Sequence, residues 1–389
     1  MKRTKVKNLA KQIRGVSYKP EDLHDSLDKD SVILLRANNI DEGKINFDDV
    51  VYVDKSKVSD EQYLKVGDVL ICASSGSKQL VGKAASVVFD SPCTFGAFCK
   101  VVRPNNNVTD YLGKYFQSGV YRRKISEVAI GANINNIRNE HIDSLELPIY
   151  EPAQAQRIVE KIGLLQNIID NRKCELSKLD ELIRARFVEM FGDPISNDKG
   201  WNTDPITAVC SRIYGGGTPS KGHPEYFEGS IPWVSPKDMK SDVITDSIDH
   251  ITKKAIANST TNLVPEGSVL MVIRSGILKH DLPVSINAVP VTINQDMKAF
   301  VPGENITASF LRNYFKAIEL DVLAGVRGVT ADNIDFKAFQ QRKIIVPPIH
   351  LQEEFEDFCR QVDKSKVAVQ KALDEAQLLF DSLMQEYFG

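Results

Sequence analysis

The sequence predicts a mixed α/β (α+β) protein in which two similar globular segments alternate with two long helices. Three observations lead to this prediction. The chain resembles itself at an offset near 200 residues, and two stretches of about 40 residues each carry a heptad pattern. In each globular segment, short β-type runs lie between Gly- and Pro-rich loops.

The internal repeat keeps its order along the chain. The matching segments are Ile13-Arg14-Gly15 with Ile213-Tyr214-Gly215, Gly67-Asp68-Val69-Leu70 with Gly267-Ser268-Val269-Leu270, Tyr111-Leu112-Gly113-Lys114-Tyr115-Phe116 with Phe310-Leu311-Arg312-Asn313-Tyr314-Phe315, Asn136-Ile137 with Asn333-Ile334, Pro152 and Gln156 with Pro348 and Gln352, and Phe191-Gly192 with Phe388-Gly389. The period is far longer than the roughly 20–50 residues of a solenoid repeat. Each repeat is therefore a whole globular segment followed by a helix, which gives globular residues 1–151, a helix over 152–191, globular residues 192–347 and a helix over 348–389.

Both helices have an apolar seam with alternating spacings of four and three, which is typical of a coiled coil. The seam residues are Ile158, Ile162, Leu165, Ile169, Leu176, Leu179 and Ile183 in the first helix, and Phe355, Phe358, Val362, Val369, Ala372, Ala376, Leu379 and Leu383 in the second. Gly192 and Pro194 end the first helix, because Gly suits the position after a C-cap and Pro cannot continue a helix. About 36 helical residues, at about 1.5 Å each, give a rod on the order of 50 Å.

The composition is that of a globular protein and excludes several classes. The 389 residues contain 49 Lys and Arg against 52 Asp and Glu, so a uniformly basic nucleic-acid coat is excluded, although local basic patches are not. No run of about 18 apolar residues is present, which argues against a membrane span. The charged start has no apolar core after it, so we expect no secretory signal. The six cysteines form no CxxC pair, and we expect free thiols in a reducing cytoplasm rather than a disulfide framework or a zinc site.

Motifs for catalysis are missing from the sequence. It contains no Gly-x4-Gly-Lys-Ser/Thr phosphate loop, no Asn-Pro-Pro-aromatic segment of the kind that amino-methylating enzymes use, and no metal-binding spacing among its six histidines. Gly215-Gly216-Gly217 does not follow the dinucleotide-binding spacing, so we interpret it as a turn. We expect a binding protein rather than an enzyme, with no metal and no cofactor of its own.

Basic and polar residues in loops and at helix ends are the candidate binding residues. Residues 1–20 hold seven Lys and Arg and no acid, and Arg122-Arg123-Lys124 form a second basic cluster. Such clusters can neutralise DNA phosphates, although a solvated terminus and a solvated helix end explain them equally well. Arg274 follows an apolar strand, so it can reach a guanine edge or bind a carboxylate within its own domain. The DNA-binding candidates are Lys11, Arg14, Lys19, Arg36, Asn38, Lys78, Lys83, Arg122, Arg123, Tyr214, Thr218, Ser220, Lys221, Lys237, Lys240, Arg274, Ser275, Lys279 and Arg327.

These motifs together resemble the specificity (S) subunits of type I restriction–modification systems. The residues that carry the resemblance are Gly216-Gly217-Thr218-Pro219-Ser220, Pro224-Glu225-Tyr226-Phe227, Ile231-Pro232-Trp233-Val234-Ser235-Pro236-Lys237-Asp238-Met239, Met190-Phe191-Gly192-Asp193-Pro194 and Pro347-Pro348-Ile349-His350-Leu351-Gln352. The resemblance covers essentially the whole chain. The first copy departs from the pattern, because Gly15-Val16-Ser17-Tyr18 replaces the Gly-Gly-Thr-Pro run and Leu34-Leu35-Arg36-Ala37-Asn38 replaces the Trp segment.

The resemblance implies two target recognition domains, each reading one half of a bipartite site in double-stranded DNA. The two helices would pack as an antiparallel coiled coil, relate the domains by a pseudo-two-fold axis and set the spacer between the half-sites. Two methylation (M) subunits would dock on the helices and supply S-adenosylmethionine and adenine methylation. Two restriction (R) subunits, in systems that have them, would add translocation and cleavage that depend on ATP and Mg²⁺. The chain itself would be non-catalytic and would act in the cytoplasm in defence against foreign DNA.

Two other hypotheses remain open at this point. The helix over 348–389 carries 4 Lys and Arg against 9 Asp and Glu, which suits a protein partner and favours a coiled-coil adaptor whose globular repeats bind other proteins. An enzyme with an undetected site, such as a nuclease, is the third hypothesis, and the missing motifs count against it.

The rod hypothesis makes a first prediction about spacing. Half-sites about one DNA turn apart, roughly 34–36 Å, would face the same side of the duplex, so a stiff rod would act as a ruler between them. We expect that inserting or deleting one heptad in both helices changes the spacer and leaves the half-sites unchanged. Selection of preferred DNA sites with the altered protein measures this, and changed half-sites at an unchanged spacer would refute the hypothesis.

Overall fold

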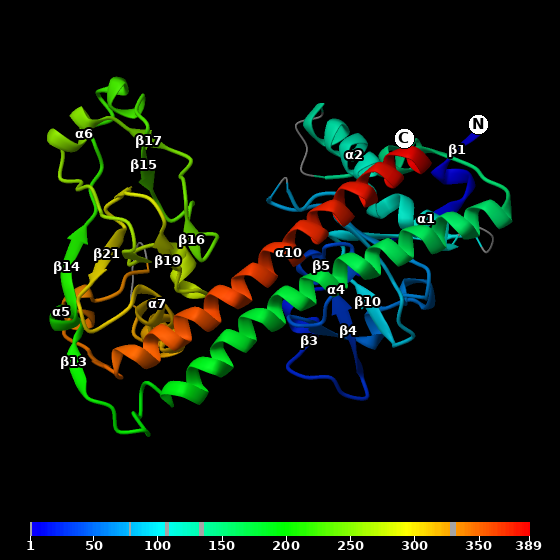
Figure 1. The fold of residues 1–389 in the computed structure, drawn as a ribbon. Helices are drawn as coiled ribbons and strands as arrows, with labels where there is room; N and C mark the ends of the chain where they lie inside the picture. The colour runs from blue at the N-terminus through cyan, green and yellow to red at the C-terminus, as the bar shows by residue number, and fades with distance from the viewer. Residues whose placement is uncertain (1, 78, 106–108, 132–135, 327–331) are drawn as a thin grey trace. The chain divides into compact units, whose positions relative to one another are not determined.

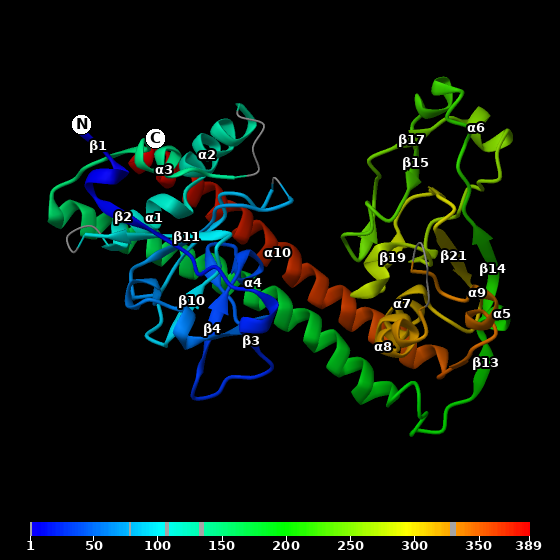
Figure 2. The ribbon, with the colours of Figure 1, turned by 180° about the vertical axis from the view of Figure 1, so that it is seen from behind.

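The computed structural model describes residues 2–77, 79–105, 109–131, 136–326 and 332–389 (Figures 1 and 2). The chain divides into two compact units. Unit 1 comprises Met1–Lys173 together with Gln370–Gly389, and unit 2 comprises Cys174–Val369. Both boundaries fall inside a long helix, so each unit contains one segment of each helix. The division predicted from the sequence, with each long helix as a separate segment, stays a prediction. The two compact units instead divide the chain inside the helices, after residues 173 and 369.

In its described residues, unit 1 combines short strands with small α-helices and its segments of the two long helices. Its strands are β1 (Arg3–Lys5), β2 (Ala10–Arg14), β3 (Leu23–His24), β4 (Ser31–Leu35), β5 (Ile40–Asp41), β6 (Lys44–Ile45), β7 (Val51–Asp54), β8 (Val69–Cys72), β9 (Ala84–Ser86), β10 (Cys93–Phe95), β11 (Cys99–Pro104) and β12 (Glu146–Pro148). Its small helices are α1 (Thr109–Gln117), α2 (Gly119–Gly131) and α3 (Asn139–Asp143), and the long helices are α4 (Pro152–Phe191) and α10 (Ile349–Phe388).

Unit 2 likewise contains short strands, small helices and one segment of each long helix. Its strands are β13 (Thr203–Pro205), β14 (Cys210–Gly215), β15 (Ile231–Val234), β16 (Val243–Ile244), β17 (His250–Ile251), β18 (Val269–Val272), β19 (Val284–Asn287), β20 (Thr292–Ile293), β21 (Met297–Pro302) and β22 (Lys343–Ile345). Its small helices are α5 (Ile206–Val209), α6 (Lys253–Ala257), α7 (Ala308–Ala317), α8 (Glu319–Ala324) and α9 (Phe336–Phe339).

The two units share one sheet topology. The sheet order β2-β11-β8-β9 in unit 1 corresponds to β14-β21-β18-β19 in unit 2, where β16 extends the sheet. Each unit also has a parallel pair, β4 with β10 and β15 with β20, and an antiparallel pair that joins its first and last strands, β1 with β12 and β13 with β22. The predicted fold class, two similar mixed α/β segments with two long helices, is therefore confirmed.

The strand register corrects the alignment of the two copies by one residue. Arg14 pairs with Lys100 and Gly215 pairs with Lys298, at the same position of the corresponding sheets. Gly15 therefore corresponds to Gly216 and not to Gly215. The sequence alignment had followed the isoleucines of the two strands, which occupy different positions in the sheets.

The long helices correspond at a constant offset. Each has 40 residues, and they begin at Pro152 and Ile349. The predicted match of Gln156 with Gln352 was one residue out, and the two side chains differ in burial, since Gln352 is fully buried and Gln156 is exposed. Gln352 donates to the carbonyl oxygens of Asn305 and Pro347 and accepts from the Thr307 amide, so it fixes the start of α7.

The predicted seam of the first helix is largely confirmed. In the second helix the prediction is wrong at Leu379, and Phe358, Ala372 and Leu383 are only partly buried. The side chains of Ile158, Ile162, Leu165, Ile169 and Ile183 are buried, whereas Leu176 and Leu179 are only partly buried. In α10 the buried residues are Phe355, Cys359, Val362, Val369, Ala376, Phe380, Met384 and Phe388. Leu379 is 52% exposed, because the adjacent Phe380 faces the core instead. Phe358 is only partly buried, because Cys359 takes the core position.

The helix segments run antiparallel within unit 2, as two ion pairs between them show. Arg186 of α4 lies 2.9 Å from Glu354 of α10, and Asp180 of α4 lies 2.5 Å from Lys366 of α10. Residue numbers therefore fall along α4 in the direction in which they rise along α10. Their apolar faces complete the core of the globular part. Phe187 and Phe191 of α4 pack edge-on or tilted against Phe310 of α7 and Phe355 of α10, with ring centroids 4.9–5.5 Å apart.

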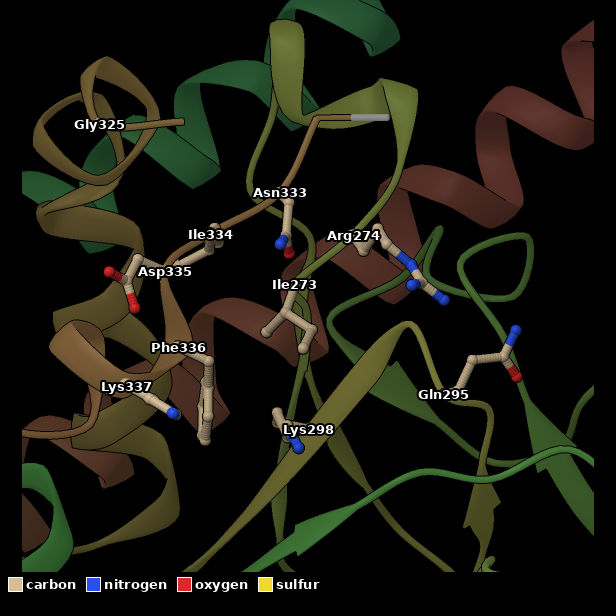
Figure 3. Close-up of a pocket in the computed structure, with 10 residues that line it drawn as sticks. All are labelled: Ile273, Arg274, Gln295, Lys298, Gly325, Asn333, Ile334, Asp335, Phe336 and Lys337. Atoms are coloured by element: carbon tan, nitrogen blue, oxygen red, sulfur yellow. The ribbon is translucent and has the colours of Figure 1, made fainter. Parts of the chain in front are cut away.

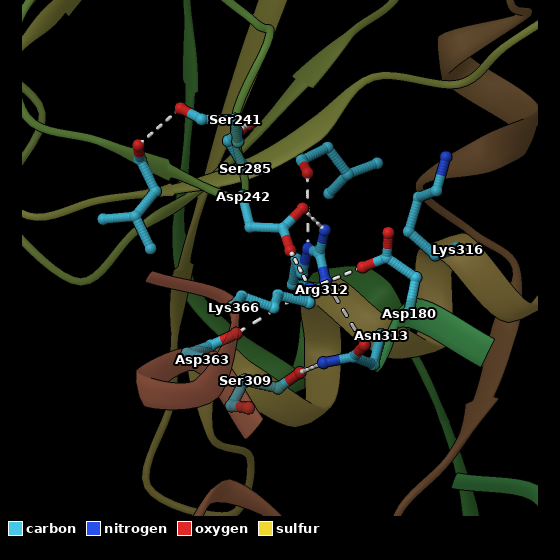
Figure 4. A network of polar contacts seen from close by, with 12 residues as sticks. Asp180, Ser241, Asp242, Ser285, Ser309, Arg312, Asn313, Lys316, Asp363 and Lys366 are labelled. Atoms are coloured by element: carbon cyan, nitrogen blue, oxygen red, sulfur yellow. Dashed lines mark hydrogen bonds and ion pairs between the residues drawn. The ribbon is translucent and has the colours of Figure 1, made fainter. Parts of the chain in front are cut away.

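A half-buried polar network in unit 2 joins the globular part to both helices (Figure 4). Asp242, which precedes β16, forms an ion pair with Arg312 of α7 and lies 3.1 Å from Lys366 of α10. Burial opposes the charge of Lys366, but its hydrogen bond with Asp180 and the nearby Asp242 raise its pKa above the usual range. Burial also opposes the charge of Asp363, the remaining acid of the network, and for a carboxyl group this raises the pKa. Through these contacts the network connects Asp242, just before the edge strand β16, to α10 directly and to α4 through Lys366 and Asp180.

The aromatic cluster predicts a strong dependence of stability on Phe355. Replacing this fully buried ring with Ala leaves a cavity between α4, α7 and α10, and we expect F355A to lower the free energy of unfolding by about 3–5 kcal/mol. Leu378 on the same helix is 74% exposed, so L378A is the matched control and changes stability by no more than about 0.5 kcal/mol. Urea denaturation of the full chain measures both, and equal effects would contradict the packing described.

Candidate functional site

A cavity of about 810 Å³ lies in unit 2 where β18 ends (Figure 3). Arg274 and Gln295 lie on one side of it, and Asp335, Phe336 and Lys337 lie on the other. The remaining lining residues are Ile273, Lys298, Gly325, Asn333 and Ile334. The lining combines three cations with amide side chains, which are the residue types that read phosphates and base edges in DNA. We call this cavity with its lining residues the strand-end site.

Arg274 is held at the strand-end site by Asp296. The Arg274 Nε and Nη2 atoms lie 2.6 Å and 2.5 Å from the same carboxylate oxygen of Asp296. The Asp296 carbonyl also accepts from the main-chain amides of Ile273 and Arg274. Of the two roles open to Arg274 from the sequence, the contact with a carboxylate of its own domain is therefore present. Its Nη1 group has no hydrogen bond within the described part of the chain, and the side chain is 47% exposed, so Arg274 keeps free donors for a ligand.

The glycine loop packs against the same turn that carries Asp296. A Cβ atom on Gly216 would lie 1.6 Å from the Asn294 carbonyl oxygen, so only glycine fits this approach. Trp233 donates its indole N–H to the Gly217 carbonyl at 3.0 Å, and the Thr218 hydroxyl donates to Gln295. The Gly-Thr-Pro motif and the Trp segment thus have a structural role, which is to place Thr218 beside the strand-end site.

The other unit 2 candidates lie around this site or on the surface. The side chains of Lys221, Lys237 and Lys240 are exposed and have no hydrogen bond or ion pair within the described residues. Lys279 is 3.9 Å from Asp332, and Ser275 caps the short 3₁₀ turn that follows Arg274. Tyr214 stacks under Arg212 at 4.6 Å, and Ser220 accepts from the Gly222 amide. Arg327 lies outside the described residues.

Most unit 1 candidates are engaged within their own unit. Three lysines are in ion pairs: Lys11 lies 2.6 Å from Glu61, Lys19 lies 3.4 Å from Glu21 and Lys83 lies 3.6 Å from Asp41. Arg36 and Asn38 both donate to the Asp49 carboxylate, at 3.0 Å and 2.7 Å. Arg122 donates to the carbonyl oxygens of Val81 and Gln79, and Arg123 donates to the Gln385 side chain. Arg14 is exposed at the end of β2, and Lys78 lies outside the described residues. The structure therefore brings together a site around Arg274 in unit 2, and of the described unit 1 candidates it brings Lys83 and Arg122 to one cavity.

Sequence reasoning missed several residues of the strand-end site. Gln295, Asp296 and Lys298 were not among the candidates, although the polar run 294–296 between two apolar strands was a usable signal. Asn333 was recognised only as part of the repeat. The repeat has a structural counterpart here. Arg274 and Asn333 form an isolated antiparallel β-bridge between their main chains, and Ser74 and Asn136 form the same β-bridge in unit 1.

The described residues offer no metal-binding group, and five of the six cysteines are buried, whereas Cys174 is exposed. In the part of the chain that the structure describes, no group of three or more His, Cys, Asp or Glu side chains could hold a metal ion. Burial raises the pKa of the Cys93, Cys99 and Cys210 thiols to about 12, so these groups stay protonated and unreactive at neutral pH.

Among the described residues, none of the helices combines the length and the apolar character that a membrane span requires.

Comparison with known proteins finds a family match for the second half of the chain. Residues 198–376 match the family described as type I restriction modification DNA specificity domain. The chain is 34% identical over 212 residues to the type I restriction enzyme EcoKI specificity subunit of Escherichia coli (strain K12), covering 54% of this chain and 46% of that protein. It is 37% identical over 180 residues to the StySPI specificity subunit of Salmonella potsdam, covering 46% and 39%. The matches thus span less than half the length of these relatives.

Two solved structures share the fold over nearly the whole chain. A chain from a structure described as the basis of complex assembly and conformational transition of the type I R-M system has a TM-score of 0.54 and 17% identity, covering 99% of this chain and 97% of its own. The type I restriction-modification S subunit from M. genitalium has a TM-score of 0.52 and 13% identity, covering 100% and 96%. These two structures show the shared fold, and the resemblance inferred from the motifs is supported by the family match over residues 198–376.

The close approach at Gly216 gives a prediction about the glycine loop. We expect G216A to destabilise unit 2 by at least about 2 kcal/mol, because the added methyl group meets a backbone carbonyl that cannot move without breaking the sheet. Gly276 has no atom within 4 Å of the corresponding position, so G276A is the control. Thermal unfolding compares the two variants, and a G216A protein as stable as G276A would contradict this account of the loop.

Proposed function

We propose that this chain, whose residues 198–376 belong to the type I restriction modification DNA specificity domain family, is the subunit that selects the DNA sequence in such a system. Each unit reads one half of a bipartite site in double-stranded DNA. The observation that carries the proposal is the strand-end site, where Arg274 is oriented by Asp296 and keeps donors free. An arginine held in this way can donate to the two acceptors of a guanine edge without first losing side-chain freedom.

The difference between the units supports two different half-sites. The position of Arg274 is occupied by Ser74 in unit 1, although both residues bridge an asparagine in the same way. A serine hydroxyl contacts a base with one donor and two acceptors and reads it less selectively than a guanidinium. The two units therefore present different chemistry to DNA from the same scaffold.

The chain acts as a non-catalytic partner in a larger assembly in the cytoplasm. Two methylation subunits bind it and bring S-adenosylmethionine, and restriction subunits, where present, bring ATP and Mg²⁺. The absence of catalytic motifs from the sequence supports this division of labour. The adaptor hypothesis is left without support, since the relatives are specificity subunits.

Arg274 and Lys237 separate base reading from phosphate binding. We expect R274Q to relax the preference for one base pair of one half-site, because discrimination by a bidentate contact is worth about 1–3 kcal/mol. K237Q removes an exposed charge and weakens binding to all sequences alike. Site selection with the chain and its methylation subunits measures both. An unchanged preference in R274Q, with binding intact, would sink the role given to Arg274.

Salt dependence tests DNA binding itself. The logarithm of the binding constant should fall linearly with the logarithm of salt concentration, with a slope near −0.9 for each phosphate neutralised. We expect the K237Q variant to reduce this slope by about one contact. A flat salt dependence would favour a protein partner over DNA.

A further inference from the structure

A second cavity lies in unit 1 and is separate from the strand-end site. Its volume is about 630 Å³, which is within the range of roughly 300–1,000 Å³ for small-molecule sites. Its walls come from the hairpin β5–β6, from β9, from α1 and from the unit 1 segments of α4 and α10. Its apolar part includes the buried side chains of Phe116, Ile169 and Phe380.

The lining of this cavity is strongly basic. Five of the lining residues are basic, Lys44, Lys83, Lys114, Arg122 and Lys173, against two acids, Glu42 and Asp170. Both acids are already in ion pairs, since Lys44 lies 2.6 Å from Asp170 and Lys173 lies 2.5 Å from Glu42. Three cations of the lining therefore have no acidic partner in the cavity wall.

These three cations differ in how they are held. Lys114 is partly buried and has no hydrogen bond or ion pair within the described residues. Burial lowers its pKa, and the nearby Asp110 and Asp170 only partly offset this effect. Arg122 donates to two neutral carbonyl oxygens, at 2.9 Å and 3.2 Å, which fix its position and leave its charge uncompensated. Lys83 is 3.6 Å from Asp41, which does not line the cavity.

The corresponding place in unit 2 has no such excess of positive charge. There, a cavity of about 620 Å³ is lined by three basic and four acidic residues, and the network around Asp242 occupies its side. By the offset of the long helices, Gln377 of unit 1 stands where unit 2 has Asp180. By the repeat, Lys114 stands where unit 2 has Asn313. Unit 1 therefore has a neutral amide where unit 2 has an acid, and a cation where unit 2 has a neutral amide.

We propose that this cavity binds a small molecule of nucleotide size through its phosphate groups, with Lys114 as the central contact. An ammonium group binds phosphate as a point charge, and Arg122 is positioned to add a second charge-assisted hydrogen bond. The amides of Gln166, Asn167 and Gln377 supply donors and acceptors for the rest of the ligand. A metal cation would be repelled here, and a wholly apolar ligand would leave the cations desolvated. The inference does not rest on the proposed function.

Calorimetric titration of the full chain tests this proposal with adenosine 5′-diphosphate and pyrophosphate as probes and adenosine as the unphosphorylated control. We expect both phosphate probes to bind one site per chain and adenosine to bind at least tenfold more weakly. K114Q should weaken the binding of both phosphate probes roughly tenfold. Q377D, which restores the acid found in unit 2, should also weaken it. K221Q, an exposed lysine of unit 2, should leave it unchanged.

The controls keep the outcome decisive. K114Q removes a cation that burial disfavours, so its thermal unfolding should match that of the unmodified chain, and the exposed Gln377 gives a second variant that cannot disturb the core. Equal affinity in K114Q and the unmodified chain, or an equal loss in K221Q, would overturn the site. A third arm titrates a short DNA duplex. If the duplex but not the nucleotides loses affinity in K114Q, the phosphate belongs to the DNA backbone and the small-molecule site is refuted.

Discussion

Each unit depends on receiving one segment from each of the two long helices. In unit 2, Phe187 and Phe191 come from α4 and Phe355 from α10, and together they close the core over α7. In unit 1, Ile162 of α4 and Phe388 of α10 do the same for α1. Because part of each core comes from the long helix that follows the other globular segment, neither core is complete without that helix. This constraint explains why unit 1 includes residues 370–389.

The shared scaffold leaves the loops free to differ. Core positions correspond closely between the copies, whereas the exposed and half-buried positions around them carry different chemistry. Arg274 replaces a serine at the strand end, and Lys114 replaces an asparagine beside the helix pair. Substitutions of this kind do not affect the packing of the sheets, so the two units can acquire different ligands at little cost in stability.

The sequence predicted the features that depend on local or periodic patterns. The repeat, the ends of the first long helix and the mixed α/β class all followed from spacing and turn residues. The second seam was wrong at Leu379 because the apolar run Leu378-Leu379-Phe380 fits the heptad in more than one way, and only the core decides which side chain is buried. The site was partly found, since Arg274 was a candidate, but its partner Asp296 lies 22 residues away and no local pattern joins them. The partner of Lys11, Glu61, lies 50 residues away, so a lysine that looks free in the sequence is in fact paired.

The central claim is that two modules on one scaffold each select their own stretch of DNA. The most direct measurement expresses the chain with the methylation subunit proposed as its partner and maps every methylated adenine in a host genome. The map is made once for the native chain and once after residues 192–347 are exchanged for those of a related specificity subunit. The account predicts a two-part recognition sequence in which the exchange alters one part and preserves the other. Methylation without a bipartite sequence, or an exchange that alters both parts together, would contradict it.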